Sequence, residues 1–254
     1  MLSILRKLRL KLLSKHKFSK YLLYAVGEII LVVVGILIAL QINTWNEGYT
    51  TKEKELKYLL LIKQEMLSNL QSINMEREIL DDYFKGLEQI LEAYAHPDPN
   101  ITNKELSGML APILSNDMDI NFKSGTLNEI IANGNLKDIT NDSIRNILAS
   151  IDGNLERLRA QETRVNDYIA KGNSILEKKG SIKQLVSDFG VSAEYGIPKN
   201  TKEVSNLFLL KDQEFENIMV LAILTGVSLD EEHYFIFEKE IKTLIDLIDK
   251  ELRQ

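Results

Sequence analysis

The stretch YLLYAVGEIILVVVGILIALQI, residues 21–42, decides how this chain is organised. It carries a single charged residue, Glu28, among side chains that are otherwise almost all apolar. At about 1.5 Å of rise per residue, a helix of this length reaches about 33 Å, which is enough to cross a hydrocarbon core of about 30 Å. We therefore expect one transmembrane helix over residues 21–45.

The residues around this helix predict its orientation. Tyr21 and Tyr24 lie at one end and Trp45 at the other, where aromatic side chains favour the two membrane interfaces. Residues 1–20 contain seven Lys and Arg and no acid, whereas residues 46–254 contain 24 basic and 36 acidic side chains. The positive-inside rule predicts a cytoplasmic N-terminal tip and an extracytoplasmic domain over 46–254. The acidic body also argues against nucleic acid as a partner, because phosphate backbones would repel it.

Two other interpretations of the apolar stretch fit less well. A cleaved signal peptide requires a small-residue cleavage site, and Ala39-Leu40-Gln41 matches that pattern poorly. A buried helix of a soluble protein is disfavoured because the uninterrupted apolar run 29–40 follows a basic tip. We expect a retained anchor.

Glu28 is the unusual residue of the anchor. On a helix it shares one face with Val32, Gly35 and Ala39, and the last two form a small-xxx-small pair that lets helices approach closely. Glu28 can be protonated and hydrogen-bond across a homo-oligomer, reach toward the headgroups or toward Tyr24, or belong to a proton pathway. We prefer the first of these and expect a transmembrane association face.

The N-terminal tip has an amphipathic pattern. Residues 2–13, LSILRKLRLKLL, place leucines on one face of a helix. Such a helix would lie on an anionic membrane surface. The expected headgroup contacts are Arg6, Lys7, Arg9 and Lys11. An acid-free, Arg-containing start is also typical of a mitochondrial targeting segment, and the sequence does not separate the two interpretations.

The anchor also carries a family resemblance. Residues 17–25, KFSKYLLYA, and 27–47, GEIILVVVGILIALQINTWNE, resemble the signature of an uncharacterised family of single-pass membrane proteins common in Bacteroidetes-type Gram-negative bacteria. The usual pattern has Asn where this chain has Thr44. Weaker similarity recurs around residues 124–136. The resemblance implies a bacterial inner-membrane protein with a periplasmic domain, and it implies no activity.

The domain beyond the anchor reads as all-α. Apolar residues recur at near-3.5 spacing over three long segments, 50–95, 142–179 and 212 to near the C-terminus. Lys63 and Arg77 interrupt the first stripe, which we expect to be continuous with the anchor or to follow it closely. These segments predict an elongated antiparallel bundle of three long helices, with a possible bend at Gly226.

Shorter helices are predicted between the long ones, at about 103–115, 125–133, 182–187 and 202–207. Thr102 and Glu105 form a capping-box pattern, and Asn141 or Asp142 and then Asp212 are the expected N-caps of the second and third long helices. The asparagines of the 128–146 region are expected to serve as caps and turns rather than as a recognition surface.

The sequence contains no recognisable catalytic or metal site. There is no cysteine, and His16, His96 and His233 stand in no two-histidine metal motif. Glu231, Glu232 and Glu238 are expected to form a solvated acidic helix face. The D-x-D-x-N run 117–121 is expected to be a capping or turn segment rather than a calcium loop, because it lacks the loop's glycine and final Glu. The aromatics are expected in the core rather than in a ligand cleft: Phe208, Phe215, Tyr234, Phe235 and Phe237.

Several functions remain compatible with this pattern. We expect a self-associating, membrane-anchored scaffold or interaction module without enzymatic activity or cofactor, whose partners are the bilayer, further copies of the chain and an unidentified membrane or periplasmic protein. The alternative is an extracytoplasmic ligand-sensing domain that signals through a membrane partner, since about 20 cytoplasmic residues leave no room for an output domain. An enzyme would require a carboxylate pair that the sequence does not reveal.

Overall fold

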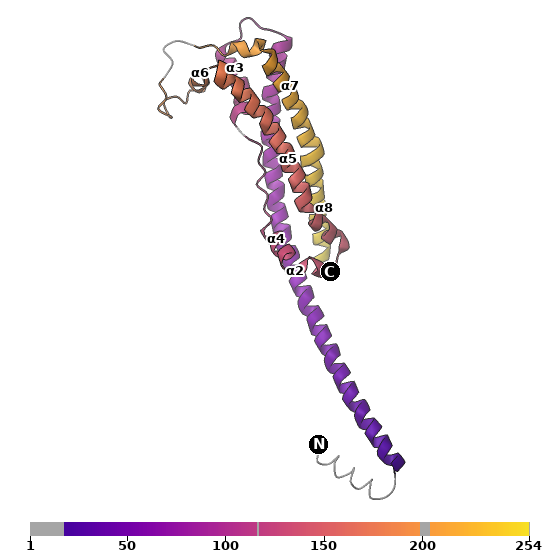
Figure 1. Cartoon of the computed structure of the whole chain (residues 1–254). Helices are drawn as coiled ribbons and strands as arrows, with labels where there is room; N and C mark the ends of the chain where they lie inside the picture. The colour runs from indigo at the N-terminus through magenta and orange to yellow at the C-terminus, as the bar shows by residue number, and fades with distance from the viewer. Residues whose placement is uncertain (1–17, 116, 199–203, 254) are drawn as a thin grey trace. The chain divides into compact units, whose positions relative to one another are not determined.

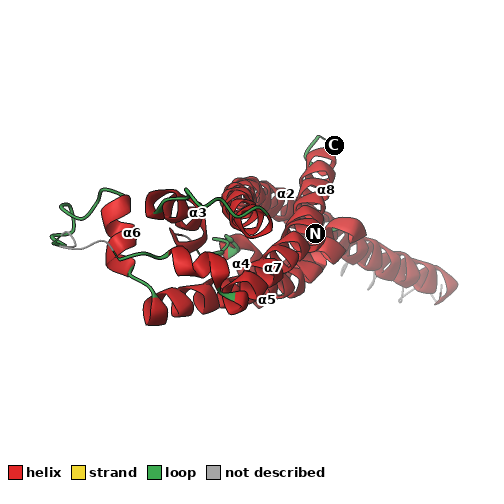
Figure 2. Ribbon diagram, turned by 90° about the horizontal axis from the view of Figure 1, so that it is seen from above, coloured by secondary structure: helices red, strands yellow, loops and turns green. Residues whose placement is uncertain are grey.

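The structure, a computed structural model, describes residues 18–115, 117–198 and 204–253, with the side chains of 18–21 and 115 left out. Throughout these ranges the chain forms helices and connecting loops and contains no strand (Figure 2). The all-α prediction is thus confirmed for the described residues. The chain divides into two compact units, residues 1–57 and 58–254, which are described in turn.

The described part of the first unit is the beginning of α2 (Phe18–Ala95). From residue 22 to residue 51 its side chains are exposed, except for the partly buried Ala25 and Glu28. By length and composition this helix is able to cross a membrane, as the sequence predicted. The polar residues after the apolar run bond within the helix: Thr44 Oγ1 donates to the Leu40 carbonyl at 3.0 Å. The segment 50–95 therefore belongs to the same helix as the apolar stretch.

The second unit is built on side-chain packing between α2, α5 (Asp142–Lys179), α7 (Gln213–Ser228) and α8 (Phe235–Glu251) (Figure 1). Buried apolar residues of α2 recur here at spacings of three, four or seven, which gives the helix one apolar face. That face consists of Leu59, Ile62, Met66, Ile73, Leu80, Leu87 and Ile90. The facing stripe of α5 consists of Ile144, Leu148, Ile151, Leu155, Leu158, Val165 and Ile169.

The two polar breaks predicted in the α2 stripe meet acidic partners on α8 and beside it. Lys63 Nζ lies 2.5 Å from Asp249 Oδ1. Arg77 lies within 2.7 Å of Asp230 and 2.9 Å of Glu238. These ion pairs favour one position of α8 along the axis of α2, because sliding one helix past the other would separate the cations from their acidic partners.

Glycine allows two close approaches in this unit. A Cβ on Gly226 of α7 would lie 2.7 Å from the Phe84 ring of α2. A Cβ on Gly86 of α2 would lie 2.7 Å from the carbonyl oxygen of Met109, in α3 (Asn103–Ser115). Side chains at these positions would separate the helices.

Side-chain caps begin the helices where the sequence predicts them. Thr102 and Glu105 exchange hydrogen bonds in a capping box before α3. Asn141 Oδ1 accepts from the first backbone N–H groups of α5, and Asp212 Oδ1 does the same for α7. The choice that the sequence left between Asn141 and Asp142 is thus settled in favour of Asn141.

The short elements follow most of the predicted ranges. They are α3, α4 (Gly125–Ala132), η1 (Asn135–Asp138), α6 (Ile182–Asp188) and η2 (Leu207–Lys211). Figure 1 places α3 and α6 at one end of the second unit and α4 toward its other end. The helix expected at 202–207 is wrong at 204–206, which are not helical. Residues 202–203 of that range lie outside the described ranges, and its last residue, Leu207, begins η2. The 3₁₀ turn η2 follows instead.

The third long helix differs from its prediction in one respect. A π-helical turn, η3 (Leu229–Tyr234), separates α7 from α8, three residues after the glycine at which a bend was expected. Such a turn inserts one residue into the helical repeat, and π-turns occur frequently at functional sites. It places Asp230 against Arg77 and buries Tyr234 in the unit.

Candidate functional site

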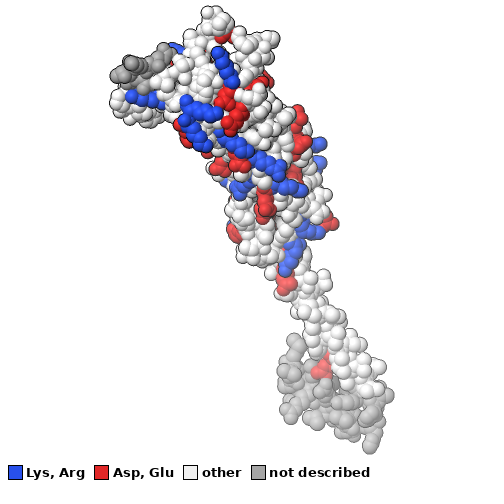
Figure 3. Space-filling view, turned by 45° about the horizontal axis from the view of Figure 1, so that its top comes forward, with Lys and Arg blue, Asp and Glu red and all other residues white. Residues whose placement is uncertain are grey.

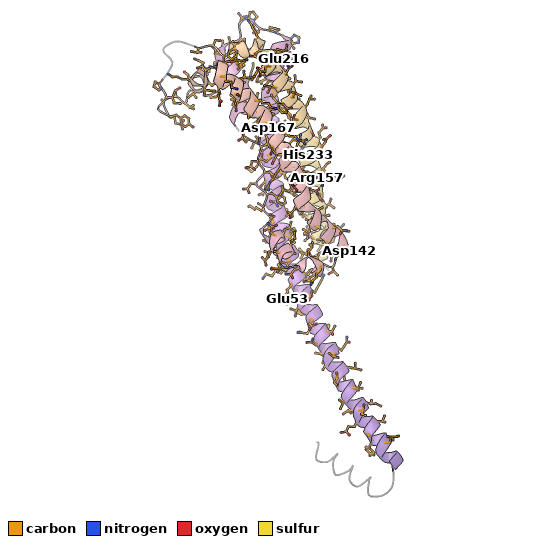
Figure 4. All side chains as sticks on the ribbon, in the orientation of Figure 1. Glu53, Asp142, Arg157, Asp167, Glu216 and His233 are labelled. Carbon is orange, nitrogen blue, oxygen red and sulfur yellow. The ribbon has the colours of Figure 1, made fainter. Side chains whose placement is uncertain are left out.

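The predicted association face lies along the first unit. Val32, Gly35 and Ala39 are exposed on α2, and Glu28 on the same face is partly exposed. A Cβ on Gly35 would meet nothing within 4 Å, so the close-approach surface is open. Figure 4 shows side chains standing out around this part of α2, and Figure 3 shows mostly uncharged (white) surface along it, with a red acidic patch.

The other residues expected to contact the membrane are only partly described. The side chains of Tyr24 and Trp45 are 58% and 78% exposed. The Tyr21 side chain lies outside the described residues, as do the expected headgroup contacts Arg6, Lys7, Arg9 and Lys11.

The second unit contains a polar site that the sequence did not predict. Its first part is a segment that is neither helix nor strand, residues 117–124, here called the strap. Asn166 of α5 pairs with Met118 of the strap, donating to its carbonyl and accepting from its N–H, both at 2.9 Å. Asn69 of α2 pairs in the same way with Lys123, both at 2.8 Å. Two amide side chains thus supply the strap with bonds that a neighbouring β-strand would otherwise give it.

A buried carboxyl group holds the middle of the strap. Glu162 of α5 is 2% exposed, and its Oε1 accepts from the Ile120 N–H at 3.1 Å. The same oxygen accepts from the hydroxyl of Tyr234 at 2.6 Å. Glu162 therefore connects α5, the strap and the π-turn η3 through one atom.

Burial controls the protonation of this group. Desolvation raises the pKa of Glu162 to about 7, although the hydrogen bonds from Tyr234 and Ile120 act in the opposite direction. The nearby carboxylates Glu76 and Asp119 raise the pKa further. Burial also raises the pKa of Tyr234, helped by Glu162, so the phenol stays protonated and donates. The site thus holds a proton that is exchanged near neutral pH.

An ion cluster lies beside η3. Arg77 donates through Nε to Asp230 at 2.7 Å and through Nη1 to Glu238 at 2.9 Å. Lys242 also donates to Glu238, which is 8% exposed. Glu238 was expected on a solvated acidic face, and this prediction is wrong because the π-turn and Arg77 draw it into the unit. Glu231 and Glu232 are exposed as expected.

We expect Arg77→Met to lower the stability of the second unit by about 1–2 kcal/mol, because the substitution leaves Glu238 buried with one cation fewer. Thermal unfolding followed by circular dichroism measures the change. Lys85→Met is the matched control on the same helix, since its exposed ion pairs with Asp81 and Asp82 contribute little. Equal losses of stability from the two substitutions would contradict the conclusion that Arg77 stabilises the buried Glu238.

A cleft opens between α5 on one side and η3 with the start of α8 on the other. Its volume is about 320 Å³, and Arg157 and His233 lie on its wall (Figure 4). Glu240 is held there by Ser150 and Asn154, at 2.9 and 2.5 Å. A volume of this size is at the lower end of those that bind small molecules, and the cleft presents both signs of charge.

The outer face of α7 is apolar and exposed. Val220, Leu221, Leu224 and Val227 lie on it, and Leu224 is 61% exposed. Contiguous exposed apolar side chains of this kind mark contact surfaces for other proteins. By contrast, the face shown in Figure 3 carries interspersed charges of both signs on the second unit.

The remaining predicted residues are distributed as follows. Phe215, Tyr234 and Phe237 are buried in the core as expected, and Phe208 is half-buried. Phe235 is exposed, so the prediction of a core position is wrong for this residue. The run 117–121 forms part of the strap, so its prediction as a cap or turn is wrong. Within the described ranges, no group of three or more His, Asp or Glu side chains is placed to hold a metal ion.

One sequence signal pointed to the site that was missed. Glu162 stands four residues after Leu158 and three before Val165, so it occupies an apolar position of the α5 stripe. A carboxyl group at such a position is buried, and a buried carboxyl needs hydrogen-bond donors.

No family model, curated protein or solved structure matches the chain.

Proposed function

We propose that this chain is a single-pass membrane protein whose extracytoplasmic helical domain, an elongated antiparallel bundle, acts as a self-associating scaffold or interaction module. The observation that carries the proposal is the exposed apolar run of α2. Its side chains from residue 29 to residue 42 are exposed, which is the state expected of a helix surrounded by lipid. The basic tip supports a cytoplasmic N-terminus and a location in a bacterial inner membrane.

Two surfaces support self-association. The track of Val32, Gly35 and Ala39 lets two anchor helices approach closely, and a protonated Glu28 adds a hydrogen bond in a medium without water. The exposed stripe on α7 provides a second apolar surface in the other unit. Copies confined to one membrane meet at high effective concentration, so modest surfaces suffice for pairing.

Disulfide crosslinking in native membranes tests this proposal. Because the chain contains no cysteine, single substitutions report single positions. We expect Ala39→Cys to give a crosslinked dimer upon mild oxidation. Leu37→Cys, which lies on the opposite face of the same turn, should give much less. Equal crosslinking at both positions, or none at either, would exclude the predicted face.

A ligand-sensing domain is the second candidate, and the cleft at Arg157 and His233 is the observation that favours it. A small molecule with both acidic and basic groups fits the charges on its wall. Ligand-dependent melting of the full chain in detergent micelles tests this function. A shift that Arg157→Ala abolishes would favour sensing, and no shift with a panel of amino acids and related metabolites would count against it.

A further inference from the structure

The strap covers an apolar surface of the second unit. Met118 and Ile120 are buried, and Phe122 is 8% exposed. The Phe122 ring lies 5.4 Å from the Phe237 ring of α8, measured between centroids. Removing the strap would therefore expose its own apolar side chains and the helix faces beneath them.

The strap is held differently from the rest of the unit. Its hydrogen bonds to α2 and α5 run to side chains, chiefly those of Asn69, Asn166 and Glu162. A helix is stabilised by its own cooperative backbone bonds, whereas these contacts are few and separate. We therefore expect local opening of the strap to cost less free energy than unfolding the helices around it.

The central contact is also electrostatically unfavourable when Glu162 is ionised. Three titratable groups face this carboxyl: Glu76 of α2, Asp119 of the strap and Tyr234 of η3. Two of them are acids, and its described hydrogen-bond donors, a backbone N–H and a phenol, are neutral. Asp119 also donates its own N–H to Glu76 at 3.4 Å, so three acids converge when the strap is closed. Opening would hydrate Glu162 and move Asp119 away from it.

We propose that the strap is a latch whose closure is controlled by the protonation of Glu162. With a neutral carboxyl group, the closed strap keeps both hydrogen bonds to Oε1 and has no buried charge. When the proton leaves, the closed form contains an ion among other acids, and the open form becomes relatively more populated. The latch thereby couples ambient pH to the exposure of Met118, Ile120 and Phe122, and of the surface that they cover.

The pH range follows from the state of Glu162 in the two forms. Burial raises its pKa from 4.5 to about 7 in the closed form, and the open form returns it toward the ordinary value. The population of the open form should rise between pH 5 and pH 7 and level off above that. The expected increase is roughly 30- to 100-fold, from linkage with a pKa difference of this size.

Amide hydrogen exchange of the full chain in detergent micelles measures this opening. Rates are followed by mass spectrometry from pH 5 to pH 8 and corrected for the intrinsic chemical rate. We expect peptides covering 117–124 to exchange faster than peptides of the α5 core at every pH, and their protection to fall as the pH rises. Strap exchange as slow as that of the α5 core at every pH would show that no separate latch exists.

Two substitutions isolate the role of Glu162. Glu162→Gln keeps an oxygen that accepts from Ile120 and Tyr234 but does not titrate, so strap protection should lose its pH dependence. Glu65→Gln is the matched control, since Glu65 of α2 accepts from the Thr126 N–H at 2.7 Å just beyond the strap. The control should retain the pH dependence. Persistence of the dependence in Glu162→Gln would overturn the proposal.

Discussion

Glu162→Gln is expected to remove most of the pH dependence of unfolding between pH 5 and pH 8. In the natural chain the folded-state pKa of Glu162 is about 7, above its ordinary value of 4.5, so the folded state binds the proton more tightly. This stabilisation is fully present below pH 4.5 and is lost as the pH rises toward 7. At about 1.4 kcal/mol per pKa unit, the difference between 4.5 and 7 corresponds to about 3.5 kcal/mol in all, of which roughly 2–3 kcal/mol is lost between pH 5 and pH 8. Chemical denaturation of the full chain in micelles, followed by circular dichroism, measures it.

The control for this prediction is Glu156→Gln, which replaces an exposed carboxylate on the same helix. Its stability curve should run parallel to that of the natural chain over the whole pH range. If Glu162→Gln also runs parallel, then Glu162 does not hold the proton and the assignment of the buried site is wrong. This measurement reports global unfolding and is separate from the local exchange of the strap.

The long helices could be predicted because they depend on local periodicity. Leu148, Ile151, Leu155 and Leu158 are spaced at three and four residues, which is sufficient to define a buried face of α5. The caps were equally local, since Thr102 and Glu105 stand three residues apart. The apolar run of α2 required only length and composition.

The strap and the π-turn could not be predicted because they depend on distant partners. Asn69 lies 54 residues before Lys123, and Asn166 lies 48 residues after Met118. No local pattern identifies such pairs, and the D-x-D-x-N run suggested a turn instead. The π-turn likewise depends on where Arg77 and Glu162 lie relative to Asp230 and Tyr234.

The charged residues that interrupt the apolar stripes of the long helices mark contacts between distant parts of the chain. Lys63 and Arg77 were recognised as breaks in α2, and each meets an acid of α8 or η3. Glu162 interrupts α5 in the same manner and meets the strap. In a helical domain without a catalytic motif, charged residues at apolar positions therefore indicate where non-local contacts form.

Gly86→Ala is expected to destabilise the second unit by about 2 kcal/mol. The new Cβ would lie 2.7 Å from the carbonyl oxygen of Met109, and because that atom is backbone, α2 and α3 would have to separate. The helix propensity of alanine offsets only about 1 kcal/mol of this cost. Thermal unfolding of the full chain measures the change.

Gly153→Ala is the matched control for Gly86→Ala. Gly153 also lies inside a long helix, α5, but a Cβ there would meet nothing within 4 Å. Only the propensity effect remains, so this substitution should stabilise the chain by about 1 kcal/mol. The two glycine substitutions are thus expected to have opposite signs, since one glycine is needed for helix contact and the other is not. Stabilisation by both would show that α2 and α3 do not approach as closely as Gly86 permits.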